Sequence, residues 1–168
     1  MNTRRKTRGA KAFTLIEVLG ATIIIGIAVV ALLAAMTSGT SVNEAGTKTT
    51  KAVFLAQEIR EWTMRLPFSD PDSGDADNPP GPDGTNPQTF VDDLDDLMDV
   101  TYNPPRNGMG NAITDMVGWS QTITLTWRNP DDLAVIVTPG SSDVINVEVS
   151  IRYQDEEILS NNWLVTRR

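Results

Sequence analysis

The chain has 168 residues, carries 22 Asp and Glu against 14 Lys and Arg for a net charge of −8, and contains neither histidine nor cysteine. The lack of these two residues removes the commonest general base, the commonest metal ligand and any disulfide. Because Gly-x-Ser-x-Gly, Walker and dinucleotide motifs are absent as well, we expect a non-enzymatic protein of one modest domain.

The positive charge is concentrated at the start of the chain. Residues 1–12 hold five of the cations and no acid: Arg4, Arg5, Lys6, Arg8 and Lys11. Such a cluster favours a cytoplasmic N-terminus by the positive-inside rule. The rest of the chain has 9 cations against 22 acids, a net charge of −13. We therefore expect the soluble part not to bind nucleic acid, since a surface that negative repels phosphate.

An apolar run of 24 residues follows, from Phe13 to Met36, with Glu17 as its single charge. About 20 apolar residues in a helix span the hydrocarbon core of a bilayer. An ordinary secretory signal is the alternative, but its apolar region runs 7–15 residues and ends at a small-x-small cleavage site. This run is longer, and Ala34–Thr37 is a poor cleavage site. The length therefore favours a retained membrane helix.

Glu17 is the most informative residue of this run. A carboxylate inside a membrane helix costs roughly 2.5–3.5 kcal/mol on insertion scales, so it is rarely kept without a use. One interpretation is a residue near the membrane surface whose side chain reaches the interface and has no further role. The other requires cleavage before Phe13. A neighbouring subunit's α-ammonium could then pair with Glu17, which the helix dipole also favours in the first turn.

Residues 37–66 predict a continuation of the same helix. Apolar side chains recur there at steps of three and four, the period of one helix face. These positions are Ala52, Leu55, Ala56, Ile59, Trp62 and Leu66. We expect one helix from about Thr14 to Leu66, bent or loosened near Gly39–Gly46 and ended by Pro67. The apolar stripe is interpreted as packing against a sheet, with a partner-binding surface as the alternative.

Residues 67–118 predict acidic loops rich in proline and glycine, with one short helix. The aspartates Asp70, Asp72, Asp75 and Asp77 alternate in a way that could supply oxygen ligands to calcium. The order does not match an EF-hand, and the alternative is a solvated acidic loop.

Residues 90–98 place four apolar side chains on one side of a short helix or irregular turn. Five aspartates accompany them: Asp92, Asp93, Asp95, Asp96 and Asp99. We interpret this segment as an apolar face docked on the domain with a wet acidic face, or else as a second candidate cation site.

The remainder predicts four strands: apolar and polar residues alternate over 119–127 and 145–153, 133–137 is an apolar run, and 158–166 follows a turn. Short turns separate the runs, which predicts an antiparallel meander. A helix lying across one face of that sheet gives an α+β fold in two layers.

The segment Lys11-Ala12-Phe13-Thr14-Leu15-Ile16-Glu17, followed by the long apolar helix, resembles the type IV pilin family, which includes the pseudopilins of type II secretion. The resemblance implies cleavage between Ala12 and Phe13 by a prepilin peptidase and N-methylation of Phe13. It implies storage as a single-pass inner-membrane protein with a periplasmic head. Assembly into a filament would follow, through the helix, Glu17 and an inner-membrane platform. Ala12 stands where the family usually has glycine, and the usual mid-membrane proline is missing, so Ala31–Ala35 should stay regular.

Looser motifs resemble the minor pilins of the PilV kind and the minor pseudopilin GspI. They are Ala52-x-x-Leu55-Ala56-Gln57-Glu58, the acidic segment 90–96 and strands that end in residues 163–166. A minor subunit is the leading interpretation. A major subunit and a signal-anchored periplasmic binding module or enzyme are the alternatives. The predicted organisation is a leader (1–12), a membrane helix (13–36), its amphipathic continuation (37–66), acidic loops (67–118) and a sheet (119–168), with calcium as the single candidate cofactor.

Overall fold

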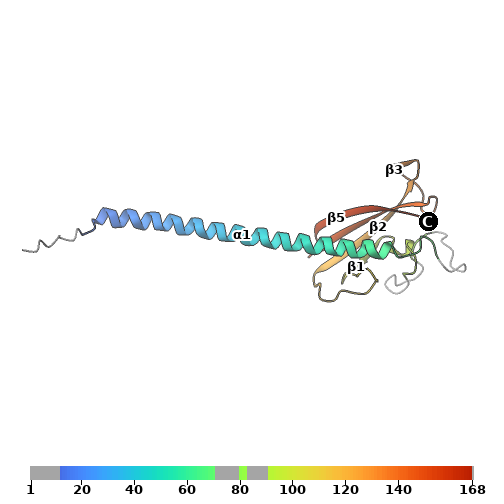
Figure 1. The fold of residues 1–168 in the computed structure, drawn as a ribbon, viewed down its shortest axis with the longest axis horizontal. Helices are drawn as coiled ribbons and strands as arrows, with labels where there is room; N and C mark the ends of the chain where they lie inside the picture. The colour runs from blue at the N-terminus through green and yellow to red at the C-terminus, as the bar shows by residue number, and fades with distance from the viewer. Residues whose placement is uncertain (1–11, 71–79, 83–90, 168) are drawn as a thin grey trace, which may run out of the picture. The chain divides into compact units, whose positions relative to one another are not determined.

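The structure is a computed structural model that describes residues 12–70, 80–82 and 91–167. Its first element is helix α1, Leu15–Thr63, which continues through Gly39 and Gly46 without a break (Figure 1). The loosening predicted at those glycines is therefore not seen in the secondary structure. The helix ends three residues before the predicted Leu66, because the N–H groups of Arg65 and Leu66 both bond the Trp62 carbonyl and close the last turn.

The chain divides into two compact units, residues 1–45 and residues 46–168, which are described separately. In the first unit the described residues are the start of α1 and its apolar turns. The second unit, called the head below, holds the rest of α1, the 3₁₀ helix η1 (Asp95–Leu97) and all five strands.

The strands of the head form one antiparallel sheet. They are β1 (Val100–Tyr102), β2 (Trp119–Asn129), β3 (Asp132–Ile136), β4 (Val144–Tyr153) and β5 (Glu156–Thr166). The order across the sheet is β1-β2-β4-β5, and β3 also pairs with β2. The predicted simple meander is thus wrong in one respect: β3 forms a hairpin with β2 and does not lie between β2 and β4. The sequence analysis also missed β1.

Strict alternation on β2 separates a buried face from a half-exposed face. Cross-strand register carries the same division to β4, where Trp127, Leu125 and Ile123 lie opposite Ile145, Val147 and Val149. The buried face shares one core with Ala52, Leu55, Ala56, Ile59 and Trp62 of α1. The predicted apolar stripe therefore packs against the sheet, and the α+β fold class is confirmed.

One buried polar side chain joins three parts of the head. Gln121 on β2 is fully buried, and its amide nitrogen donates to the carbonyls of Leu55 on α1 (3.0 Å) and Arg106 (3.1 Å). Its amide oxygen accepts from the N–H of Arg106 at 2.6 Å. Buried polar groups are stable only when bonded in this way. Gln121 therefore fixes the loop that follows β1 against both the helix and the sheet.

A close approach of the same loop explains one glycine. Gly110 has a φ of +77°, and a Cβ at this position would lie 2.8 Å from Trp62 Cζ2. Any other residue would meet both backbone strain and a clash there. The ring of Trp62 in turn lies 5.6 Å from that of Tyr102, so the loop closes the end of the core.

Gln121→Leu should lower the free energy of unfolding by about 1–3 kcal/mol, because the buried Arg106 N–H loses its acceptor and the carbonyls of Leu55 and Arg106 lose the amide donor, while the volume is kept. Thr124→Val on the opposite, half-exposed face is the matched control and should change stability by less than about 0.5 kcal/mol. Urea denaturation of fragment 43–168, which we expect to fold without the apolar helix, measures both. Equal stability of the two variants would refute the joining role of Gln121.

Candidate functional site

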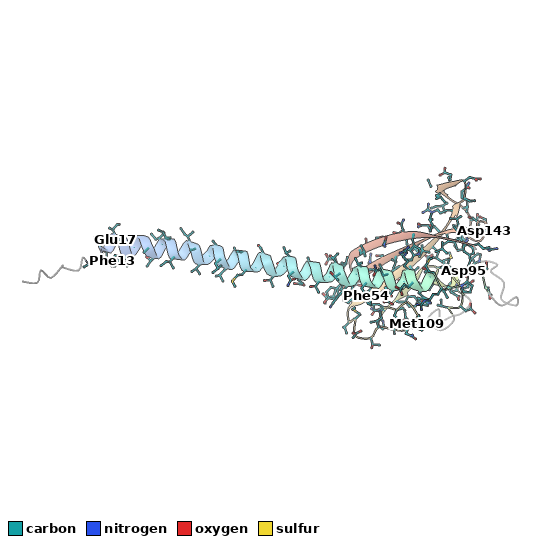
Figure 2. The ribbon with its side chains drawn as sticks, in the orientation of Figure 1. Phe13, Glu17, Phe54, Asp95, Met109 and Asp143 are labelled. Atoms are coloured by element: carbon teal, nitrogen blue, oxygen red, sulfur yellow. The ribbon has the colours of Figure 1, made fainter. Side chains whose placement is uncertain are left out.

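The start of α1 carries a reciprocal set of hydrogen bonds between Thr14 and Glu17. The Glu17 carboxylate accepts from the Thr14 N–H and from the Thr14 hydroxyl, each at 3.2 Å. The Glu17 N–H donates to Thr14 Oγ1 at 3.3 Å. This is a capping box, in which Thr14 is the N-cap and Glu17 is the third helical residue. Figure 2 shows Glu17 and Phe13 together at this end of the helix.

The capping box gives Glu17 a local role that the sequence analysis did not consider. Its carboxylate satisfies a backbone donor that the helix leaves unbonded, and it lies where the helix dipole favours an anion. The spacing Thr14-x-x-Glu17 is itself the capping-box signature, so the signal was present in the sequence.

The predicted processing site lies just before the helix. Ala12 and Phe13 have no regular secondary structure, and both are exposed, Phe13 to 81%. The bond between them is therefore outside α1.

The first half of α1 exposes its apolar side chains on every side. Large apolar residues from Leu15 to Val42 are about half or more exposed, and the helix contains an 18-residue window with a mean hydropathy of 2.8. By length and composition the helix can cross a membrane. Its hydroxyls also suit an apolar environment, because those of Thr22, Thr37 and Thr40 donate to carbonyls in the preceding turn. A helix that is apolar all round requires lipid or other apolar helices around it.

The predicted calcium ligands are mostly beyond the part of the chain that the structure describes. Asp72, Asp75 and Asp77 lie outside the described residues, while Asp70 lies within them and is half-buried. The calcium hypothesis for this group therefore stays a prediction.

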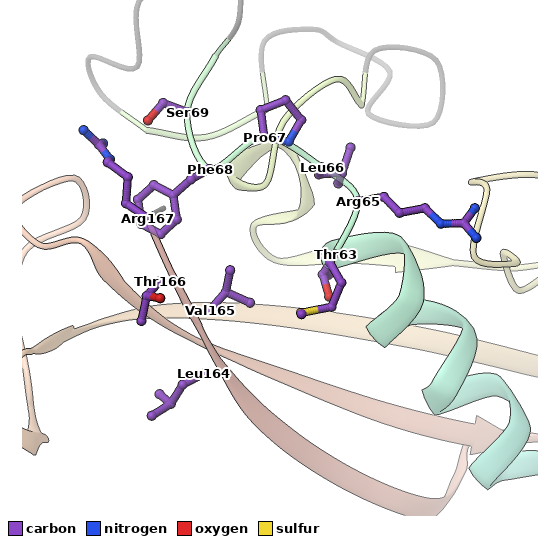
Figure 3. Close-up of a pocket in the computed structure, with 11 residues that line it drawn as sticks. Thr63, Arg65, Leu66, Pro67, Phe68, Ser69, Leu164, Val165, Thr166 and Arg167 are labelled. Atoms are coloured by element: carbon purple, nitrogen blue, oxygen red, sulfur yellow. The ribbon is translucent and has the colours of Figure 1, made fainter.

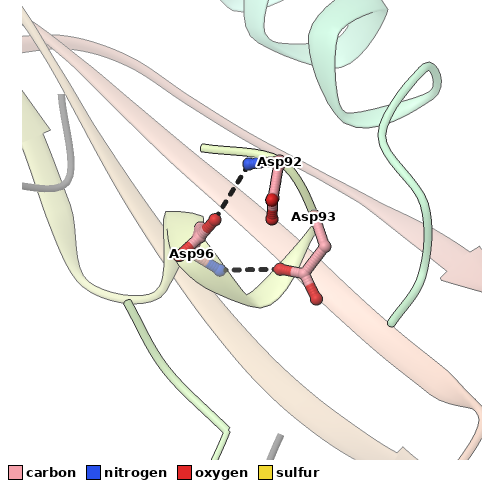
Figure 4. Close-up of side chains that lie close together, drawn as sticks. All are labelled: Asp92, Asp93 and Asp96. Carbon is pink, nitrogen blue, oxygen red and sulfur yellow. Dashed lines mark hydrogen bonds between the residues drawn. The ribbon is translucent and has the colours of Figure 1, made fainter. Parts of the chain in front are cut away.

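A second acidic group, at Asp92, Asp93 and Asp96, is brought together before and within η1 (Figure 4). Oxygens of the three carboxylates lie within 4.8 Å of one another, and Asp93 and Asp96 are buried. Asp93 Oδ1 accepts from the N–H groups of Asp95 and Asp96, and Asp96 Oδ2 accepts from the N–H of Asp92. These bonds cap the turn. The same three residues offer the oxygen ligands that a hard cation prefers.

The buried ring of Tyr102 lies near this acidic group. The pKa of Tyr102 is raised to about 12, mainly by burial; the charge of Arg106 opposes this rise and the charge of Asp96 adds to it. The guanidinium of Arg106 lies 5.2 Å from the ring centroid of Tyr102. The Tyr102 hydroxyl has no hydrogen-bond partner among the described residues. The phenol therefore stays neutral at physiological pH and serves the core.

A groove of about 520 Å³ lies between the end of α1 and the end of β5 (Figure 3). It is lined by residues 63–69 and 164–167, and its charged side chains are Arg65 and Arg167, with no acid among the lining residues. Arg65 donates to the Gly108 carbonyl, and Arg167 pairs with Asp143 at 3.2 Å while remaining half-exposed. The lining of the groove is thus basic on a strongly acidic chain, although Asp143 offsets the charge of Arg167.

Comparison of the chain with protein-family models, with curated proteins and with solved structures gave no match. Two features of the chain bear on its function: the exposed apolar half of α1 with its capped start, and the head that packs on the other half of that helix.

Asp93→Ala should lower the free energy of unfolding by about 0.5–2 kcal/mol, because two N–H groups lose their acceptor. Asp93→Asn keeps an acceptor oxygen and should retain most of the stability. Thermal melts of both variants with calcium and with chelator check the capping role and the cation hypotheses together. Calcium that binds beside η1 should raise the melting midpoint of the parent chain but not that of Asp92→Asn. Calcium that binds the group at Asp70 should raise the midpoint of both.

Proposed function

We propose that this chain is a structural subunit of a type IV pilin-like filament, as a minor pilin or a minor pseudopilin of type II secretion. Prepilin peptidase removes residues 1–12, and Phe13 is N-methylated. The mature chain is stored in the inner membrane as a single-pass protein before assembly. Its partners are other pilins or pseudopilins and the inner-membrane assembly platform. The head is periplasmic until assembly carries it into the filament.

The proposal is supported above all by the difference between the two halves of α1. Its first half is apolar and exposed on all sides, and its second half buries one stripe in the core of the head. An apolar half of this kind can lie in a membrane before assembly and against other such helices afterwards. A filament subunit needs both environments for one segment.

A structural role also accounts for the chemistry of the head. The segment without residues 1–12 carries a net charge of −13 and contains no histidine or cysteine. The acids that gather near η1 cap their own backbone, and the buried tyrosine faces the core. We therefore propose that the head makes assembly contacts and neither turns over a substrate nor binds nucleic acid.

The mature chain should begin at Phe13. Intact-mass analysis of the protein extracted from membranes should show the loss of residues 1–12 and the gain of one methyl group. The same chain expressed without prepilin peptidase is the control and should keep its full mass. A full-length mass in cells with an active peptidase would favour a signal-anchored periplasmic protein over a filament subunit.

The capping box allows the charge of Glu17 to be separated from its hydrogen bonds. Glu17→Gln keeps the box but removes the charge, and Glu17→Ala removes both, whereas Thr14→Ala breaks the box and leaves the charge. If a neighbouring Phe13 ammonium pairs with Glu17, both Glu17 variants should incorporate poorly into filaments and Thr14→Ala should incorporate well. Both Glu17 variants should still insert into the membrane, because each removes a carboxylate whose burial in lipid costs free energy.

Blots of sheared filaments, normalised to the amount of each variant in membranes, measure this incorporation. Normal incorporation of Glu17→Gln combined with loss for Glu17→Ala and Thr14→Ala would show that Glu17 acts only as a helix cap.

A further inference from the structure

The two edges of the sheet are formed by strands of different length and composition. Strand β5 forms one edge, and β1 and β3 pair with β2 at the other. Natural edge strands are usually kept short or carry charges, proline or a covering segment. Over residues 158–166 β5 has no charged residue, glycine or proline. It is therefore a long edge with few of the usual protections.

The register shows which backbone groups of β5 face away from the sheet. The Arg167 N–H donates to the Asp143 carbonyl, so this pair and every second pair along the ladder are bonded. The backbone groups of Thr166, Leu164 and Ser160 must then point outward, where no described strand pairs with them. The N–H of Asn162 also points outward, and the side chain of Asn161 accepts from it.

Strand β3, at the other edge, is shorter than β5 and is exposed over its whole length. All five of its residues are exposed, although three are large and apolar: Leu133 at 47%, Val135 at 45% and Ile136 at 61%. It pairs with β2 only at Asp132 and Ile136. Two acids, Asp131 and Asp132, mark its beginning. It is an apolar strand with an acidic start and an irregular middle, where the Ala134 N–H donates to Asp132 Oδ1 and the Ala134 carbonyl accepts from Arg128.

The pairings fix the relative direction of these two strands. β3 is antiparallel to β2, β2 to β4, and β4 to β5, so β3 runs antiparallel to β5. If two heads lie side by side in the same orientation, β3 of one would meet β5 of the other as an antiparallel partner. The acidic start of β3 would then lie at the end of β5, beside the groove that contains Arg65 and Arg167.

We propose that β3 of one copy of this chain adds to the β5 edge of a second copy. The contact would bring Asp131 and Asp132 to the cationic groove and the apolar side chains of β3 toward Leu164, which is 44% exposed. Strand addition of this kind takes its affinity from main-chain hydrogen bonds and its choice of partner from side chains. Because the two edges differ, the contact is head-to-tail, and along a filament it repeats from one copy to the next.

The shared orientation of neighbouring heads rests on the proposed function, since subunits of one membrane-assembled filament are parallel. The opposing charges also explain how such acidic heads could approach one another. Charge complementarity of this sort sets register and excludes wrong partners.

The absence of cysteine makes a cross-linking test direct. The full-length chain with Asp132→Cys and Thr166→Cys, oxidised in membranes from cells that assemble the filament, should give a ladder of dimers, trimers and higher species. Within one chain the two sites are separated by about 14 Å across three strand spacings, so they cannot form a disulfide. The matched control Thr101→Cys with Thr166→Cys uses the same sheet edge away from β3 and should give no ladder.

Single variants identify the geometry. A mixture of the Asp132→Cys chain and the Thr166→Cys chain should stop at dimers, and either chain alone should give monomers. Dimers from Thr166→Cys alone would show a two-fold contact between β5 edges and overturn the proposal. A cross-link to a different protein in place of the ladder would overturn the assignment to a second copy.

Charge exchange tests the register. In the two-cysteine chain, Asp131→Arg should lower the cross-linking yield by about threefold or more, and Arg65→Glu added to it should restore the yield. If the ladder is missing while the chain is still cut before Phe13 and recovered in filaments, the strand contact is wrong and the proposed function stands. If neither cutting nor recovery in filaments is seen, the proposed function itself fails.

Discussion

The constraint on which the rest depends is the removal of the first half of α1 from water. A helix with large apolar side chains exposed around its whole circumference is not stable in aqueous solution, whatever the quality of the head. The hydroxyls of Thr22 and Thr37 donate to carbonyls of the helix, so neither brings an unsatisfied donor into lipid. By length and composition the helix can cross a membrane, and a bundle of similar helices would cover the same surface. Anchoring and assembly are two ways to meet the same requirement.

The head is built so that the other half of the same helix is held firmly. Ala52, Leu55 and Ile59 lie fully in the core, and the carbonyl of Leu55 accepts a bond from the buried Gln121. The indole N–H of Trp163 on β5 donates to the Thr63 hydroxyl at the end of α1 (3.2 Å). Packing alone would allow a helix to slide along a sheet, whereas directional bonds at both ends of the stripe fix its position.

Several acidic residues accept hydrogen bonds from the backbone at the start of a helix. Glu17 bonds the N-cap of α1, and Asp93 bonds two N–H groups at η1. Both lie at the start of a helix, where the first backbone N–H groups have no partner within the helix. A carboxylate in such a position gains charge-assisted hydrogen bonds, so an acidic cluster can be explained by capping before a ligand is considered.

The sequence by itself determined the fold class and every helix and strand except β1. The change from an all-round apolar run to a one-sided stripe marked the two halves of α1, and period-two alternation marked β2 and β4, because burial on one face imposes these periods. The three residues of β1 were too few to show a period.

Only the tertiary structure decided how the strands pair, how Gln121 joins distant segments, and that β3 and β5 form unlike edges. Pairing depends on contacts between residues far apart in the chain, such as Gln121 with Leu55 or Asp143 with Arg167, and no local pattern encodes them. The apolar pattern of β3 resembled a core strand, yet every residue of it is exposed. Whether an apolar strand is buried depends on what lies beside it, which local sequence does not specify.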